Sequence, residues 1–476
     1  MSDTSFFWHD YETFGPDPRW DRPAQFAGIR TDVELNEIGV PVMLYCQPTP
    51  DYLPDPEACL LTGILPQTCL KQGLPEYRFA EAVEAELGRT GTIGVGYNSI
   101  RFDDEVTRHL FWRALLDPYA REWRNRCSRW DLLDVVRCTH ALRPDGIEWP
   151  VHPDGRPSFK LEHLSQANGL SHEQAHDALS DVRATIGLAR LIKTQQPRLW
   201  DFCLKLRNKQ AVLAEIGDGR PFIHVSGMYG TERGSLAIVW PLARHPSNRN
   251  EIIVWDLAFD PSELEAMSVE DVRLRLFSKT EDLPAGQPRL PIKGLHINKA
   301  PIVIGNLKTL TPPVIERWGI DMPQIRANLA VAEAITPRLA GLWPDVYARR
   351  AMSDGDIDVE ADLYGGFIGD ADRRRLDDWR QSLPSAPIPM PGYEDPRLEE
   401  LSFRYRAKHF PDILKGEERQ RWFEHRHARL HRGAGGGLTL ADYANRIDAL
   451  TETLPPDDQR SQLLLEALYD YGEQIA

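Results

Sequence analysis

Residues 6–15 read FFWHDYETFG, and they set the structure expected for the N-terminal region. The three leading aromatic residues predict a buried strand over residues 5–13, because aromatic side chains are enriched in strands. Residues two apart on a strand point to the same face, so Asp10 and Glu12 project side by side. Taken alone, the pair fits two explanations equally. It is either a solvated strand end or part of a site for a divalent cation, which binds several carboxylate oxygens.

The bulk composition bounds the class of protein. A chain of 476 residues predicts two or three domains. It has no long apolar run and no recognisable signal segment, so we expect neither a membrane span nor secretion. The six cysteines form no C-x-x-C pair, which argues against a zinc site or a disulfide scaffold and favours the cytoplasm. A net charge of −15 does not exclude a nucleic-acid partner, because a local basic groove is sufficient.

The pattern of elements divides the chain into three parts. Strands and helices alternate through residues 1–196, which predicts an α/β domain; the strands are expected at 5–13, 38–46 and 91–98, and the helices at 77–88, from about 103, and up to Pro197. Residues 197–350 contain short β-rich runs separated by Gly, Pro and Asn, typical of a small barrel or sandwich with inserted helices. Residues 351–476 have helical periodicity. The fold class is therefore a multidomain combination of α/β and α+β.

A cation site needs more than two carboxylates, and two further segments supply them. In GYNSIRFDDE, Asp103 and Asp104 follow a strand and begin a helix. Acids are common at such positions as caps and dipole partners, so only one of the two need be a ligand. We expect Asp104 and Glu105 to be ordinary helix-start acids.

The segment AHDALSDVRATIGLARLI supplies the last acid. Asp181 lies at helical spacing on a stripe that is otherwise mostly apolar, and a core-facing acid is costly unless it is paired or bound to metal. His176 precedes it by five residues, about 140° round the helix, and is expected at the N-terminal edge of the helix. A lone histidine is more often a structural hydrogen-bonding group, but beside a metal acid it is a candidate general base.

These motifs resemble those of a known superfamily. The stretches DYE, NSIRFD and HDALSD, in this order, are similar to the motifs of the histidine-bearing subgroup of DEDD exonucleases. The likeness extends through SRWDLLDVVR, RPSFKLEHL, HVSGMYG, HPSNRN, HINKAP and FRYRAKHFP, and the chain as a whole resembles the bacterial exonuclease I family.

The resemblance implies an architecture and an activity. The architecture is a ribonuclease-H-like exonuclease domain over 1–196, a Src-homology-3-like barrel over 197–350 and a helical domain over 351–476, which together form a C-shaped clamp. The activity is processive 3′-to-5′ hydrolysis of single-stranded DNA in repair and recombination, releasing nucleoside 5′-monophosphates. Two Mg²⁺ ions, for which Mn²⁺ can substitute, would be held by Asp10, Glu12, Asp103 and Asp181, with His176 as general base.

The resemblance also implies residues that hold the strand. Aromatic and arginine residues interleave over 108–137, and although many of them are expected in the core, aromatic faces can stack unpaired bases. The expected substrate contacts are Glu12, Thr13, Phe14, Arg108, Tyr119, Trp123, Arg137, Lys160, Lys209, Asn250, Lys293 and Asn298. At position 160 the family has an arginine, so this chain keeps the charge but loses the bidentate fork.

The expected partners are single-stranded DNA and the acidic C-terminal tail of single-stranded DNA-binding protein. We expect a monomeric, nucleoid-associated cytoplasmic protein. Two other readings stay open: an exonuclease that acts on RNA or proofreads for a polymerase, and an inactive DEDD scaffold that binds single-stranded DNA. The barrel and helical regions argue against the first, and the complete set of four acids and a histidine argues against the second.

Overall fold

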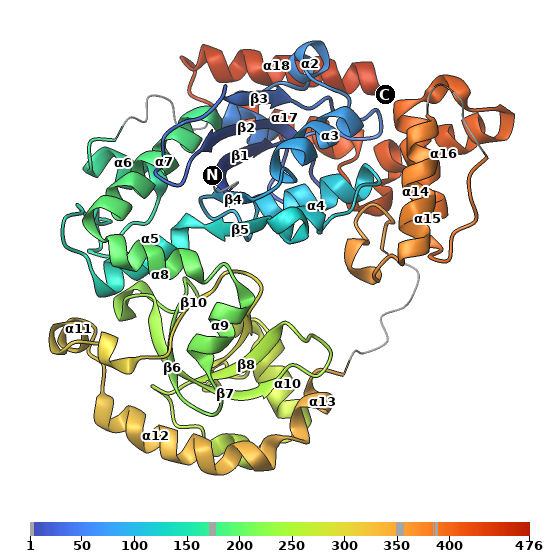
Figure 1. Cartoon of the computed structure of the whole chain (residues 1–476). Helices are drawn as coiled ribbons and strands as arrows, with labels where there is room; N and C mark the ends of the chain where they lie inside the picture. Colours follow the sequence, from blue (N-terminus) through green and yellow to red (C-terminus); the bar gives the residue numbers. More distant parts are fainter. Residues whose placement is uncertain (1–3, 171–177, 349–356, 384, 386–388) are drawn as a thin grey trace. The chain divides into compact units, whose positions relative to one another are not determined.

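The structure, a computed structural model, describes residues 4–170, 178–348, 357–383, 385 and 389–476, and its elements are drawn in Figure 1. The chain forms two compact units. The first contains residues 1–128, 172–183 and 353–476, and the second contains residues 129–171 and 184–352. Each unit is described by itself below.

The first unit is built on strands in the order β3-β2-β1-β4; they are β1 Ser5–Thr13, β2 Pro23–Thr31, β3 Val42–Tyr45 and β4 Thr92–Gly96. Strands β1, β2 and β3 are antiparallel neighbours, whereas β1 and β4 are parallel. The expected strands at 5–13 and 91–98 are confirmed, and the one at 38–46 is shorter than expected. Because β1 and β4 are parallel, their carboxyl ends meet at one edge of the sheet, where open α/β sheets place ligands.

The sequence pattern did not predict strand β2, and the composition of this strand explains why. All nine of its residues are buried, yet Gln25 and Arg30 interrupt the apolar alternation. Arg30 is tolerated there because its guanidinium donates to Ser5, Thr92 and Glu86. Buried polar side chains within a strand thus hide it from the alternating pattern that the sequence is searched for.

Helices of both ends of the chain belong to the first unit. The N-terminal ones are α1 Pro56–Thr62, α2 Pro66–Gln72, α3 Glu76–Leu87 and α4 Asp103–Arg113. The C-terminal ones are α14 Asp370–Ser382, α15 Arg397–His409, α16 Gly416–Arg432, α17 Leu440–Thr453 and α18 Gln459–Ile475. The helices expected at 77–88, from about 103 and beyond 351 are confirmed.

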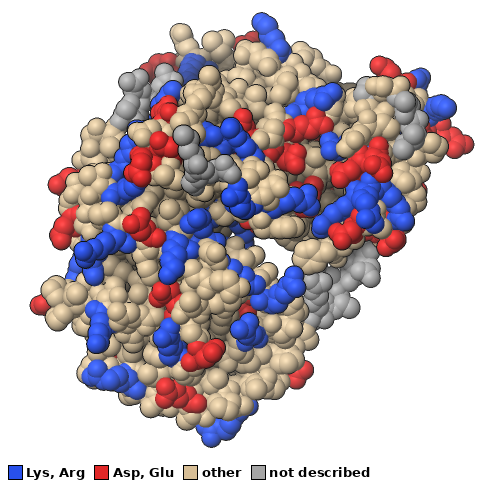
Figure 2. All heavy atoms as spheres, viewed as in Figure 1, with Lys and Arg blue, Asp and Glu red and all other residues tan. Residues whose placement is uncertain are grey.

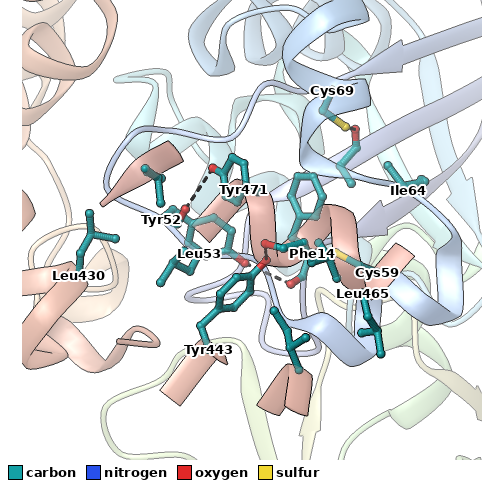
Figure 3. Packing of buried hydrophobic residues seen from close by; sticks show 14 residues of the cluster. Phe14, Tyr52, Leu53, Cys59, Ile64, Cys69, Leu430, Tyr443, Leu465 and Tyr471 are labelled. Atoms are coloured by element: carbon teal, nitrogen blue, oxygen red, sulfur yellow. Dashed lines mark hydrogen bonds between the residues drawn. The ribbon is translucent and has the colours of Figure 1, made fainter. Parts of the chain in front are cut away.

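An aromatic cluster joins the two ends of the chain inside this unit. Phe14 and Tyr52 lie in one buried cluster with Tyr443, Leu465 and Tyr471, and Figure 3 shows these side chains converging. The hydroxyl of Tyr471 donates to the carbonyl of Tyr52 at 3.4 Å. Helices α17 and α18 therefore complete the core next to the end of β1.

A buried ion network reinforces this junction. The carboxylate of Glu360 accepts from Arg22 at 2.7 Å, from Arg429 at 3.3 Å and from Lys408. Burial alone would raise the pKa of Glu360, but Lys408, Arg429 and Arg22 outweigh it and hold this pKa well below its ordinary value. The charges are thus paired rather than isolated, as burial requires.

The second unit carries a five-stranded antiparallel sheet in the order β10-β6-β7-β8-β9; its strands are β6 Phe222–Val225, β7 Leu236–Arg244, β8 Glu251–Asp256, β9 Ile292–His296 and β10 Ile302–Ile304. The β-rich character expected for 197–350 is confirmed. Its helices are α5 Leu132–Leu142, α6 Leu161–Ala167, α8 Pro197–Lys205, α9 Lys209–Ile216, α10 Val269–Phe277, α11 Pro312–Arg317, α12 Met322–Ile335 and α13 Leu342–Val346.

Two elements cross the division between the units. Strand β5 Ser128–Asp131 begins at the last residue of one first-unit segment, and helix α7 Ala178–Gln195 continues from the first unit into the second. The helix expected to stop at Pro197 is confirmed, because α7 ends at Gln195 and Pro197 opens α8. Proline suits the first turn of a helix, where its missing N–H is not needed.

The surface carries both signs of charge. On the face drawn in Figure 2, acidic and basic side chains are interspersed rather than separated. Among the described residues, no helix combines the length and apolar character needed to cross a membrane.

Candidate active site

Three of the predicted acids meet in the first unit. Asp10, Glu12 and Asp181 can each place a carboxylate oxygen so that all three atoms lie within 4.8 Å of one another. The fourth acid, Asp103, reaches the same strand, because its Oδ1 accepts from the backbone N–H of Tyr11 at 3.1 Å. The structure therefore brings together the four carboxylates that the sequence motifs single out.

The sheet positions these acids at its carboxyl edge. Asp10 and Glu12 lie on the second half of β1, and Asp103 opens α4 after β4 ends at Gly96. A Cβ on Gly96 would lie 2.6 Å from Cβ of Ser99 and 3.0 Å from the carbonyl oxygen of His9. Only glycine lets the turn after β4 come this close to β1, and this approach brings Asp103 to the pair on β1.

The last acid, Asp181, lies on a mostly apolar face of helix α7. Ala178, Thr185 and Leu188 are buried on this helix, and Asp181 lies on the same stripe in its first turn. This is the arrangement that the stripe of residues predicted. His176, the candidate general base, lies outside the described residues.

The carboxylates repel one another. Burial raises the pKa of Asp10 well above its ordinary value, and the charges of Asp103, Glu12 and Asp181 raise it further. Four acids at one point are costly in water-poor surroundings unless a cation neutralises them. All-oxygen ligands are the set that hard divalent cations prefer, so the residues present fit a divalent metal centre.

The two acids after Asp103 lie in the first turn of α4, as expected, and each is also paired with an arginine. Asp104 is 1% exposed, and its Oδ1 accepts from the equally buried Arg121 at 2.5 Å. Glu105 accepts from Arg108 at 2.7 Å and also from the hydroxyl of Tyr364. Three consecutive acids thus have three different partners, and only Asp103 turns to the carboxylates of β1.

Arginine and aromatic residues of the predicted strand path lie around α4. The guanidinium of Arg108 stands 5.3 Å from the centre of the Tyr119 ring. Trp123, which follows the short helix η1 Ala120–Glu122, is 61% exposed. An indole exposed to this degree is available for stacking on a base.

Thr13 and Phe14 were expected beside the terminal nucleotide. Thr13 is 8% exposed, and its hydroxyl donates to the carbonyl of Gly15 at 2.7 Å. Phe14 is 1% exposed, and its ring belongs to the core cluster of Figure 3. The structure brings the Phe14 side chain into the core rather than into the acidic site, because the chain turns at the end of β1.

The remaining predicted contacts lie in the second unit. Lys209 donates to Oδ1 of Asn250 at 2.6 Å, so these two are brought together. Arg137 pairs with Asp134 at 2.7 Å, and Lys293 lies 3.9 Å from the centre of the Tyr229 ring. The exposed predicted contacts of this unit are Lys160 and Asn298.

Two aromatic residues that the motifs did not single out lie beside Tyr119 and Arg108, two of the predicted DNA contacts. Phe367 is 86% exposed, with its ring centre 6.2 Å from that of Tyr119, and Tyr364 is 50% exposed. Tyr119 and Phe367 also line a cavity of about 330 Å³ together with Arg124. The available signal was the stretch LYGGF, in which aromatic residues flank glycines that cannot shield them.

Comparisons with known proteins agree with this geometry. The family model described as an exonuclease matches residues 7–189, the exonuclease I SH3-like domain matches 207–349, and the exonuclease I C-terminal domain matches 357–475. The exodeoxyribonuclease I of Escherichia coli K12 is 44% identical over 478 residues, which cover 99% of this chain and 98% of that protein.

Solved structures are similar over the same length. Escherichia coli exonuclease I in complex with a dA16 oligonucleotide has a TM-score of 0.92 at 43% identity, covering 99% of this chain and 100% of that one. A zinc-bound form of the Escherichia coli complex with single-stranded DNA has a TM-score of 0.91 at 43% identity, covering 99% of each chain. An ExoI/SSB-Ct complex has a TM-score of 0.90 at 42% identity and covers 100% of both chains.

Proposed function

The chain belongs to the bacterial exonuclease I family, and from that membership we propose that its acidic site hydrolyses single-stranded DNA from the 3′ end. It is an exodeoxyribonuclease of the ribonuclease-H-like, SH3-like and helical architecture. The observation that carries the proposal for the site is the meeting of Asp10, Glu12 and Asp181 within 4.8 Å, with Asp103 bonded to the strand between the first two.

The acids are proposed to hold two Mg²⁺ ions, for which Mn²⁺ substitutes. The residues that would hold them are Asp10, Glu12, Asp103 and Asp181. When bound, divalent ions of this kind activate a water molecule and neutralise charge on the departing 3′ oxygen. The zinc-bound form of the Escherichia coli relative supports a divalent centre, and the preference for Mg²⁺ rests on the all-carboxylate ligand set.

The chain's own residues then handle the strand and the proton. His176 is proposed to take the proton from the attacking water, as its place in the motif HDALSD suggests. The water oxygen bonds to phosphorus, the bond from phosphorus to the 3′ oxygen breaks, and a nucleoside 5′-monophosphate leaves. The departing 3′ oxygen takes up a proton from solvent water, so the shortened strand ends in a 3′ hydroxyl and can enter again.

DNA contacts are proposed for aromatic and basic residues of each unit taken by itself. In the first unit these are Arg108, Tyr119, Trp123 and the additional Phe367, with Glu12 and Thr13 near the terminal nucleotide. In the second unit they are Arg137, Lys160, Lys209, Asn250, Lys293 and Asn298. Stacking on aromatic faces is independent of sequence, which suits an enzyme that degrades any single strand.

A protein partner is also proposed. The solved ExoI/SSB-Ct complex supports binding of the acidic C-terminal tail of single-stranded DNA-binding protein. Such a partner would bring the enzyme to strands in the cytoplasm, where repair and recombination intermediates arise.

The test is digestion of an end-labelled single-stranded DNA oligonucleotide in Mg²⁺. A 5′ label should shorten one nucleotide at a time, with nucleoside 5′-monophosphates as product and activity lost in EDTA and restored by Mg²⁺. Matched RNA and duplex DNA run beside it. Faster digestion of RNA would overturn the DNA assignment, and binding without any Mg²⁺-dependent product would point to the inactive scaffold.

A further inference from the structure

The guanidinium of Arg108 is almost fully engaged by this chain's own side chains. Its Nε and one terminal nitrogen donate to the two carboxylate oxygens of Glu122, at 2.7 and 3.0 Å. Its other terminal nitrogen donates to Glu105 at 2.7 Å and to the Tyr364 hydroxyl at 3.2 Å. An arginine has five N–H donors, so four have partners among the described residues and the fifth has none there.

The contact with Glu122 has the geometry that arginine uses for phosphate. Two parallel N–H···O bonds form a fork-to-fork pair, the arrangement by which guanidinium groups hold carboxylates and phosphates alike. The Arg108 and Glu122 side chains are 6% and 10% exposed, so the pair is poorly screened by solvent. Burial lowers the pKa of Arg108, but Glu122 and Glu105 outweigh it and raise this pKa well above its ordinary value.

The pair lies on the proposed strand path. Arg108 covers the ring of Tyr119 at 5.3 Å, and Glu122 directly precedes the exposed Trp123. Two carboxylates face one guanidinium here, so Arg108, Glu105 and Glu122 together carry a net negative charge. A DNA phosphate near Arg108 would therefore encounter a net negative charge. The sequence, by contrast, predicts that Arg108 attracts the phosphate.

We propose that Glu122 is a positioning residue of the strand path, which holds Arg108 by its fork so that a single N–H remains for a strand phosphate. Glu122 thereby weakens the grip on DNA through Arg108. Phosphate contacts dominate the affinity of such grooves, and a strand that must advance after every cleavage benefits from a weaker contact. This inference rests on the proposed function, because it requires that DNA passes Arg108.

The first test is the salt dependence of DNA binding by Glu122→Gln, which removes the charge and keeps the shape. Fluorescence anisotropy of a labelled dT oligonucleotide in EDTA measures binding without cleavage. The variant should bind at least about threefold more tightly. Its plot of log affinity against log salt should steepen by about 0.7, the value for one added phosphate contact on a single strand. Weaker binding or an unchanged slope would overturn the inference.

A matched control separates this effect from the change in net charge. Glu86→Gln removes one charge from another acid of the same unit, whose carboxylate also pairs with an arginine, Arg30, at 3.0 Å. This variant should keep the wild-type affinity and slope. If Glu86→Gln steepens the slope as much as Glu122→Gln does, the inference fails.

A double-mutant cycle tests whether Glu122 acts through Arg108. In an Arg108→Gln background, Glu122→Gln should leave the affinity and the salt slope unchanged. Equal tightening in both backgrounds would show plain repulsion of DNA by Glu122 and overturn the positioning role. Glu122→Asp, which keeps a carboxylate, should remain close to the wild-type slope. A slope as steep as that of Glu122→Gln would contradict a role for the fork.

Kinetics distinguish this inference from the proposed function. Glu122→Gln should lower KM for single-stranded DNA without raising kcat, and a KM equal to the wild-type value overturns the inference alone. A wild-type enzyme that neither binds nor digests single strands overturns the proposed function itself.

Discussion

The backbone N–H of Tyr11 donates to Oδ1 of Asp103 at 3.1 Å, so the peptide between Asp10 and Glu12 holds the third acid of the site. This contact gives Asp103 a different role from its neighbour Asp104, which is bonded to Arg121. We propose that Asp103 binds metal and that Asp104 supports the fold, and the two roles predict different losses.

Asp103→Asn should abolish Mg²⁺-dependent hydrolysis while the protein stays folded, because the substitution removes a ligand charge at a site of mutual repulsion. Asp104→Asn should instead destabilise the fold by about 3–5 kcal/mol, the cost of leaving one member of a buried ion pair alone. Urea unfolding and single-turnover rates on the same preparations separate the two. A stable, inactive Asp104→Asn beside an active Asp103→Asn would reverse the assignment.

Asp10→Asn should raise the melting temperature of the protein in EDTA at pH 8. The native pKa of Asp10 lies above its ordinary value, so the native state binds this proton more tightly than the unfolded state. Stability is then lost as pH rises through the native pKa, and asparagine does not incur that loss. The stabilisation should shrink as pH falls toward the ordinary pKa of an aspartate, and Mg²⁺ should stabilise the wild type more than the variant.

One outcome of this comparison would contradict the proposed repulsion between the carboxylates. If Asp10→Asn lowers the melting temperature in EDTA at pH 8, the four carboxylates do not destabilise one another in the metal-free protein. The case for a cation that relieves their repulsion would then lose its support.

Trp123→Ala should raise the dissociation constant for single-stranded DNA by about 5- to 150-fold, since stacking of one base on an aromatic ring contributes about 1–3 kcal/mol. Phe423→Ala is the matched control, because Phe423 is 60% exposed where Trp123 is 61% exposed and lies on α16, outside the proposed path. Equal binding by the two variants would remove Trp123 from the path.

Glu360→Gln should destabilise the protein by about 3–5 kcal/mol, because Arg22, Lys408 and Arg429 would lose a shared carboxylate inside the first unit. Chemical denaturation at neutral pH measures the effect. The variant's hydrolysis rate per folded molecule should remain close to wild type, and a stability change below about 1 kcal/mol would show that the network contributes little.

The local sequence pattern was enough to predict the elements that carry the acids. Strand β1, the start of α4 and helix α7 follow from the aromatic run, from the acids after a strand and from the stripe around Asp181. It failed at β2, because buried Gln25 and Arg30 hide the alternation, and at Phe14, because the core partner Tyr443 is more than four hundred residues away in the chain.

The sequence likewise could not predict which side chains pair with the acidic residues. Nothing local shows that Asp104 pairs with Arg121, that Glu122 also binds Arg108, or that Tyr364 reaches Glu105. Each of these contacts depends on where a separate segment packs, and only the folded chain decides which acids remain for a metal.

The most direct test of the account is the rate of nucleotide release by Asp181→Asn from a 5′-labelled single-stranded DNA at saturating Mg²⁺, compared with wild type. Nucleotide release should fall by about 100-fold or more, with DNA binding in EDTA retained and the melting temperature no lower than that of wild type. A rate within about twofold of wild type would contradict the claim that these carboxylates form the catalytic metal centre.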